Sequence, residues 1–245
     1  MSTHVTTHNP VRSDLTTAPT TAPTTGPAVP ARRSGSRLWA VAGIGAGVCG
    51  IGTIVSSGMV NAIYDPELVG DPAGITARLV EQVPTMYAFH TFTTLGAVLL
   101  VVFAAGLHRR LRAALPDSAL PTVALAGLIG TAFVSIMGSG LDTEFMMGLP
   151  IGDAIQDGNA AMFNHWIGTI PWLWTLSGLS GLALFAAHRR GGVPRWIGRV
   201  GLVLGGLTLL LGVSPLQYMA GMTGPLWLLV TAIGFVVGDR AYRAS

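Results

Sequence analysis

Two histidines and two carboxylates are the residues of this sequence whose types and spacing point to chemistry. His90 and His165 lie near the ends of two long apolar runs, and Asp142-x-Glu144 directly follows a third run. Imidazole and carboxylate groups together form sites for zinc and manganese. His90, His165, Asp142 and Glu144 are therefore the candidate metal ligands, although their spacing matches no zinc signature. The alternative is that they are polar residues at the rim of a membrane domain.

A haem held between His90 and His165 is a second hypothesis, because two axial ligands must reach one iron from opposite faces. Counted at ~1.5 Å per residue from the His-Arg-Arg sequences that end the same two runs, His90 lies ~27 Å and His165 ~35 Å away. This mismatch disfavours a shared haem unless Pro171 kinks the second of these runs. No cofactor is therefore expected. The absence of lysine also excludes a Schiff base to retinal or pyridoxal phosphate.

The elements that must position these residues are membrane helices. Hydrophobic residues make up 50% of the chain and charged residues only 10%, whereas a soluble domain has roughly 25% charged residues. Six apolar runs are each about long enough to cross a ~30 Å hydrocarbon core, and none alternates like a strand of a membrane β-barrel. The predicted fold is an all-α bundle of six transmembrane helices, approximately Leu38–Val60, Pro84–Leu107, Pro121–Leu141, Asn159–Ala187, Trp196–Val213 and Met222–Gly238.

The arginines predict the orientation of this bundle. With the N-terminus in the cytoplasm, only Arg78 falls outside, and basic residues are retained on the cytoplasmic side during insertion. Both termini are therefore expected in the cytoplasm, and the lysine-free, Gly- and Ala-rich composition suggests the inner membrane of a bacterium. Because the arginines are spread between apolar runs, they form no patch for nucleic acid. The arginines expected inside are Arg12, Arg32, Arg33, Arg37, Arg109, Arg110, Arg112, Arg189, Arg190, Arg195, Arg199, Arg240 and Arg243.

Residues 1–36 are predicted to form a disordered cytoplasmic tail, and residues 37–245 the transmembrane domain. The tail is rich in Thr and Pro and cannot bury enough apolar surface to offset the entropy of ordering. A cleaved signal peptide is the alternative for the first run, because Arg32-Arg33 precedes it and Val60-Asn61-Ala62 loosely fits a cleavage site. The run of about twenty-three residues is longer than a signal sequence needs, so a retained helix is expected.

The runs also suggest three tandem helical hairpins. The second and fourth runs end in Ala-Ala-Gly-Leu-His-Arg-Arg and Phe-Ala-Ala-His-Arg-Arg, and His90-x3-Thr94 and His165-x3-Thr169 stand near their other ends. The alternative is that these similarities arise by chance between segments of similar amino-acid composition. Glycines such as Gly201-x3-Gly205 allow helices to approach closely, within the chain or against a second copy or a membrane partner.

The segment between Glu144 and Asp157 contains Phe-Met-Met-Gly-Leu-Pro-Ile, which is apolar but too short to span a membrane. We expect it to lie flat in the outer interface or to fold back between helices. Met146, Met147 and Leu149 would then cover an outward-facing cavity, and a ligand is first expected there.

Three features of residues 37–245 are similar to a known family. Asp71-Pro72-Ala73 leads into Leu79, the second run ends in Leu-His-Arg-Arg-Leu-Arg112, and the runs pair as hairpins. In these features the chain resembles the six-helix integral membrane proteins of actinobacteria that are grouped as a domain of unknown function. The resemblance implies a six-helix bundle, and it implies no activity and no catalytic residue.

Three classes of function fit these observations. The first expectation is a non-catalytic membrane component or partner subunit, because no ionisable residue lies deep in a span and the helix faces are rich in glycine. The second is a binder or carrier of a small molecule or lipid with an outward-facing cavity. The third is a metal- or haem-binding membrane enzyme that uses His90 and His165. The lipid bilayer is the partner in every case.

Overall fold

The computed structural model describes residues 37–152 and 154–239, which form helices joined by turns. The predicted all-α bundle is confirmed, because the described chain contains 6 helical segments long and apolar enough to cross a membrane. The protein is a multi-pass membrane protein, and the prediction for residues 1–36 lies outside the described residues. The spans are Leu38–Met59, Val83–Ala114, Leu120–Ile151, Asp157–Arg189, Arg195–Val213 and Gln217–Val237.

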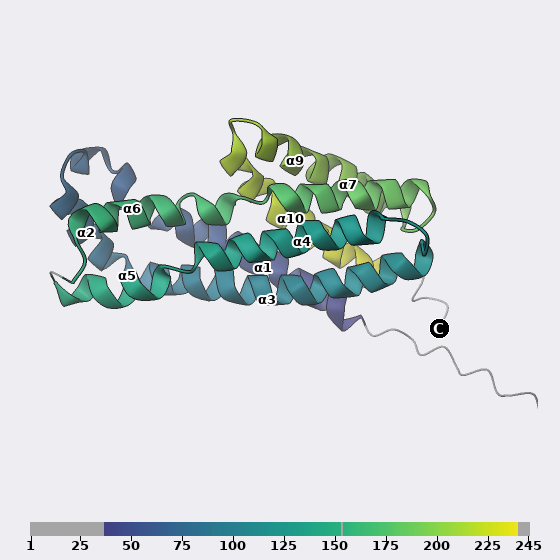
Figure 1. Cartoon of the computed structure of the whole chain (residues 1–245), viewed down its shortest axis with the longest axis horizontal. Coiled ribbons are helices and arrows are strands. Elements are labelled where there is room, and N and C mark those ends of the chain that lie inside the picture. The colour runs from purple at the N-terminus through teal and green to yellow at the C-terminus, as the bar shows by residue number, and fades with distance from the viewer. Residues whose placement is uncertain (1–36, 153, 240–245) are drawn as a thin grey trace, which may run out of the picture. The chain divides into compact units, whose positions relative to one another are not determined.

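The spans are built from α-helices and short 3-10 or π-helical turns (Figure 1). The α-helices are α1 (Leu38–Met59), α2 (Pro72–Glu81), α3 (Val83–Ala114), α4 (Leu120–Gly138), α5 (Asp142–Gly148), α6 (Asp157–Ile167), α7 (Thr175–Arg189), α8 (Arg195–Val200), α9 (Gly206–Val213) and α10 (Ala220–Val237). The short turns are η1 (Ala62–Tyr64), η2 (Pro66–Leu68), η3 (Leu149–Ile151), η4 (Ile170–Trp172), the π-helical η5 (Gly201–Gly205) and η6 (Gln217–Met219).

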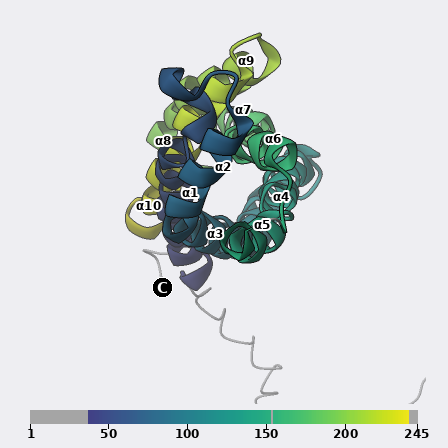
Figure 2. The same ribbon diagram turned by 90° about the vertical axis from the view of Figure 1, so that its left-hand side faces the viewer.

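Spans that follow one another in the chain also pack against one another. Contacts run from α1 to α3, α4, α7, α9 and α10 in turn, and α10 returns to α1. The spans therefore form a closed ring of antiparallel neighbours, which Figure 2 shows from one end. Because α3 packs on α4 as extensively as α4 packs on α7, the packing does not single out three hairpins, and the hairpin layout stays a prediction.

Glycines allow α7 to lie directly against the fifth span. A Cβ atom added to Gly181 would lie 2.7 Å from the Cα of Gly205, and one added to Gly178 would lie 2.6 Å from the carbonyl oxygen of Gly205. Gly201 and Gly205 are buried on this contact. The predicted glycine pair of the fifth span therefore serves packing inside the chain.

Three spans are longer than a membrane is thick. The second, third and fourth spans contain 32, 32 and 33 residues, or about 48 Å of helix at 1.5 Å per residue, against a hydrocarbon core of ~30 Å. Part of this extra length lies at one end, where α5 and α6 extend past the connection between α9 and α10, together with α2, which precedes the second span (Figure 1). We call this end the head and define it as residues 60–89 and 142–167.

The head has a hydrophobic core of its own, separate from that of the bundle. The rings of Phe145 from α5 and Phe163 from α6 stack there, with centroids 4.1 Å apart and planes 4° from parallel. Because its apolar side chains are buried against one another, the head holds its helices together outside the bundle core. The buried members of the head core are Val60, Ala62, Ile75, Leu79, Val83, Met86, Phe89, Phe145, Met146, Leu149, Ala160, Phe163 and Ile167.

The structure corrects the expectation for the segment that follows the third run. The segment neither lies flat nor folds back, but continues the third span as α5 and η3. Met146 and Leu149 are buried in the head core, while Met147 is exposed and its sulfur accepts a hydrogen bond from the Tyr87 hydroxyl. Apolar side chains of this short segment therefore help to build the head.

The two ends of the bundle carry opposite charge. Among the described residues, the head holds Arg78 and most of the acids, while the remaining arginines lie at the other end together with Asp117 and Asp239. We call this other end the arginine end. Its described arginines are Arg37, Arg109, Arg110, Arg112, Arg189, Arg190, Arg195 and Arg199, and the described acids of the head are Asp65, Glu67, Asp71, Glu81, Asp142, Glu144 and Asp157.

Candidate functional site

Two spans are interrupted at the boundary between bundle and head. The third span breaks between Gly138 and Asp142, and the fourth is non-helical or 3-10 between Gly168 and Trp174. Pro171 lies inside the second break, where its ring and missing N–H prevent a regular helix. The two breaks are in contact, because a Cβ atom on Gly138 would lie 3.1 Å from the Cγ of Pro171.

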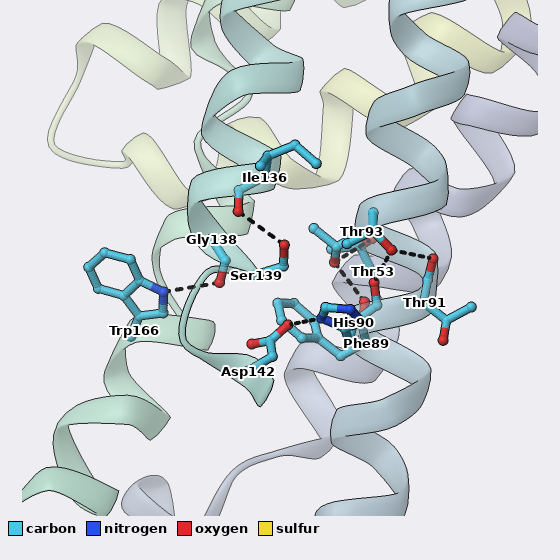
Figure 3. Close-up of polar contacts among 11 residues, drawn as sticks. Thr53, Phe89, His90, Thr91, Thr93, Ile136, Gly138, Ser139, Asp142 and Trp166 are labelled. Atoms are coloured by element: carbon cyan, nitrogen blue, oxygen red, sulfur yellow. Dashed lines mark hydrogen bonds and ion pairs between the residues drawn. The ribbon is translucent and has the colours of Figure 1, made fainter. Parts of the chain in front are cut away.

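Side chains satisfy carbonyl groups that the breaks release from helical hydrogen bonding. The indole N–H of Trp166 donates to the carbonyl oxygen of Gly138 at 3.0 Å (Figure 3). The indole N–H of Trp174 donates to the carbonyl oxygen of Pro171 at 3.1 Å, and the Ser57 hydroxyl donates to the carbonyl oxygen of Ile167. Backbone polar groups at membrane depth must find such partners. The interruptions are therefore built into the fold and held by specific side chains.

His90 and Asp142 meet where α3 passes the first break. The Nδ1 atom of His90 lies 3.0 Å from Oδ2 of Asp142 (Figure 3). The Asp142 side chain is fully buried and that of His90 is 33% exposed. The other carboxyl oxygen, Oδ1, has no hydrogen-bond partner among the described residues. A rim position was expected for Asp142, so its burial is a correction, and the pair ties the third span to the second.

On the side of this pair that faces the arginine end, the middle of the bundle is closed. The Thr93 hydroxyl contacts the Thr53 hydroxyl at 3.2 Å and the carbonyl oxygen of Phe89 at 2.7 Å (Figure 3). The void beside these threonines, also lined by Trp174, has a volume of about 10 Å³. A void of that size is at the lower limit for one water molecule. No ligand therefore fits between α1, α3 and α7 at this level.

The break in the fourth span lines a much larger cavity at the head end of the bundle. The cavity has a volume of about 490 Å³, which is within the usual range for small-molecule sites. It is open to the surface, because Tyr64, His165 and Tyr218 are exposed. Aromatic rings, hydroxyl groups and an imidazole form its walls. The lining residues are Ser57, Gly58, Val60, Tyr64, His165, Gly168, Thr169, Trp172, Tyr218 and Met219.

Hydrogen bonds and ring contacts fix the walls of this cavity. The Trp172 indole N–H donates to the Ser57 hydroxyl oxygen at 3.1 Å. The Tyr64 and His165 rings meet edge to face with centroids 6.0 Å apart. Burial raises the pKa of Tyr64, and the nearby Tyr218 raises it further. Tyr64 therefore keeps its hydroxyl proton at neutral pH and can donate a hydrogen bond.

Asn164 joins the cavity-lining loop to the fourth span. Its amide nitrogen donates to the carbonyl oxygen of Val60 at 2.7 Å, and its amide oxygen accepts from the backbone N–H of Ile63 at 2.8 Å. The side chain is fully buried. Because Val60 and Ile63, which precede Tyr64 in the chain, are both bound to Asn164 of α6, the fourth span helps to position Tyr64.

The four residues proposed as metal ligands fall in three places. His90 and Asp142 form the buried pair, His165 lines the cavity beside Tyr64, and Glu144 is exposed on α5. Within residues 37–152 and 154–239, no group of three or more His, Cys, Asp or Glu side chains is placed to hold a metal ion. The structure thus brings together two of the four candidates, and metal binding by any of them stays a prediction.

Several cavity residues were not predicted from the sequence. Tyr64 and Tyr218 come from loops far apart in the chain, and Ser57 looks like an ordinary small polar residue in apolar surroundings. Pro171 was the one available signal, since a proline inside a span marks an interruption.

No protein-family model, no curated protein and no solved structure matches the chain.

Proposed function

We propose that the protein is a membrane binder or carrier of a small amphipathic molecule, which it takes up in the cavity at its head end. The observation that most supports this proposal is that the fourth span is interrupted between Gly168 and Trp174 and lines a cavity of about 490 Å³ there. Irregular backbone at membrane depth is tolerated where it is buried in protein or lines a cavity, and substrate sites of carriers lie at such interruptions. The bundle is closed at the level of Thr53 and Thr93, as expected for a carrier whose binding cavity opens on one side of the membrane only.

The walls of the cavity suggest the chemistry of the ligand. Tyr64, Trp172 and Tyr218 offer ring faces, and the tyrosine hydroxyl groups and the His165 imidazole offer hydrogen bonds. No lining residue carries a fixed charge. The best match is an uncharged ring compound with one or two hydrogen-bond acceptors and an apolar body.

The orientation of the protein is part of the proposal. The arginine end is placed in the cytoplasm, which leaves both ends of the chain inside and the cavity facing outward. An inner membrane of a bacterium and membership of the six-helix actinobacterial family are proposed with it, on the strength of the sequence features alone.

Two other classes of function remain predictions with less support. A non-catalytic subunit was expected because no ionisable group lay deep in a span and the helix faces carried many glycines. Gly178, Gly181, Gly201 and Gly205, however, face other helices of the same chain. A haem or metal enzyme would use His90 and His165 together. The two histidines have different neighbours, because His90 contacts Asp142 and His165 contacts the ring of Tyr64.

Binding of duroquinone, an uncharged ring with two carbonyl acceptors, tests the proposal. The purified full chain is expected to bind it, and Tyr218→Phe is expected to weaken binding about 5-fold, the effect of one lost hydrogen bond of about 1 kcal/mol. His165→Ala should weaken it at least as much, because a ring contact with Tyr64 is lost as well. Calorimetric titration in detergent measures both effects.

The matched control is Tyr87→Phe, which removes a tyrosine hydroxyl in the head but outside the cavity. Its affinity for duroquinone should equal that of the unchanged protein. The proposal fails for this ligand class when duroquinone does not bind, or when Tyr87→Phe and Tyr218→Phe weaken binding equally.

A further inference from the structure

A second cavity lies at the arginine end, whereas the first lies at the head end of the bundle. It has a volume of about 660 Å³ and is bounded by the end of α3, the α7–α8 connection, α8 and the end of α10. Its charged lining residues are Arg110, Arg195, Arg199 and Asp239. Three arginines and one acid give this lining a net positive charge, so the cavity favours an anion.

The single acid of the lining is held by an arginine. Arg110 binds Asp239 through two hydrogen bonds, Nε to Oδ2 at 2.6 Å and Nη2 to Oδ1 at 2.9 Å. The Asp239 side chain is 1% exposed and that of Arg110 is 13% exposed. This planar two-bond arrangement is the strongest ion-pair geometry available to arginine. The pair forms a fixed and nearly neutral wall, and the positive charge of the cavity comes from the other two arginines.

Arg195 and Arg199 are placed to bind an anion together. They are four residues apart on α8 and therefore on the same face of the helix. Both are exposed, and no carboxylate in the described part of the chain forms an ion pair with either. Two guanidinium groups that line one cavity repel each other, and a shared phosphate relieves that repulsion while accepting several hydrogen bonds.

The depth of the cavity identifies the source of the phosphate. Trp196 lines it and packs along α10, because a Cβ atom on Gly238 would lie 2.9 Å from the indole nitrogen. Tryptophans at the ends of spans lie at headgroup level, and basic pockets between span ends bind anionic headgroups. We propose that this cavity is a binding site for the phosphate of an anionic phospholipid, held by Arg195 and Arg199. The site does not depend on the function proposed for the head end.

Native mass spectrometry of the purified full chain with phosphatidylglycerol or phosphatidylcholine tests the site. Phosphatidylglycerol should bind more tightly, because its phosphate charge is not balanced by a choline group. The double variant Arg195→Gln/Arg199→Gln should weaken phosphatidylglycerol binding about 30-fold, since each arginine near a membrane surface contributes about 1 kcal/mol. Both residues are exposed, so the variant is expected to keep its fold, which its circular dichroism spectrum checks.

The matched control is Arg109→Gln/Arg112→Gln, which removes the same charge from exposed positions at the same end but outside the cavity. Its affinity for phosphatidylglycerol should change far less. An equal loss in the two double variants, or equal binding of the two lipids, overturns the proposal. Inorganic phosphate is added as a competitor, and displacement of the lipid at millimolar concentration overturns the assignment to a lipid in favour of a soluble phosphate.

Discussion

Replacing His90 by alanine should lower the free energy of unfolding by about 3 kcal/mol, the upper end of the cost of leaving a buried acceptor without its hydrogen-bond partner. The reason is that Asp142 is fully buried and its Oδ1 atom already lacks a hydrogen-bond partner among the described residues. Without the imidazole, neither carboxyl oxygen has a described side-chain partner. Unfolding of the purified chain by titration with sodium dodecyl sulfate measures the change.

The reverse substitution should be much milder. Asp142→Ala removes the buried carboxyl group itself and leaves a histidine that is 33% exposed and can bind water. We expect a loss of about 1 kcal/mol, the net value of an ordinary hydrogen bond. The double variant should then be more stable than His90→Ala alone. An Asp142→Ala variant as unstable as His90→Ala, or a double variant that shows the sum of both losses, contradicts this account of the pair.

Gly181→Ala should strongly destabilise the bundle, with a loss of about 3 kcal/mol, at the upper end of the cost of overpacking. The added Cβ would lie 2.7 Å from the Cα of Gly205, 2.9 Å from Nε1 of Trp227 and 3.0 Å from the carbonyl oxygen of Gly201. Two of these three atoms belong to backbone, which cannot rotate away. The same unfolding titration reports the loss.

Gly158→Ala is the matched control for this substitution. Gly158 is an exposed residue of α6, and a Cβ atom there would meet nothing within 4 Å. Alanine is the better helix former by roughly 0.5–1 kcal/mol, so the control should be unchanged or slightly more stable. If both glycine variants behave alike, close packing of α7 on the fifth span does not hold the bundle together.

Most of the fold follows from the lengths of the apolar runs. Lipid requires about twenty apolar residues for each crossing, and this requirement predicts all six spans. The predicted bounds of the first, fourth and fifth spans agree with the structure within two residues, whereas the second and third spans continue to Ala114 and Ile151, past the predicted ends at Leu107 and Leu141. The head could not be predicted in the same way, because its helices continue spans two to four beyond the bilayer. Phe145 and Phe163, which stack in its core, are eighteen positions apart, and no local pattern pairs them.

The sequence identified chemical groups of the site but not their arrangement. His90 and Asp142 were both chosen by residue type, and the structure pairs them. The burial of Asp142 could not be foreseen, because a carboxylate after an apolar run usually marks the start of an exposed loop. The cavity was expected near Met146, whereas it lies at the break around Pro171. Its walls depend on contacts between distant segments, such as Asn164 with Val60, and spacing along the chain does not show these.

The interrupted fourth span lines an accessible cavity, which we propose binds a small ring compound. Gly58→Cys places a thiol on its wall, where the added Cβ meets nothing within 4 Å, and replacing the buried Cys49 by alanine removes the native thiol. A charged maleimide should label this cysteine rapidly in the purified chain, and duroquinone should slow the labelling. Ser177→Cys, at a fully buried position, should stay unlabelled. Labelling at Gly58→Cys as slow as at Ser177→Cys, or unchanged by duroquinone, would contradict the claim.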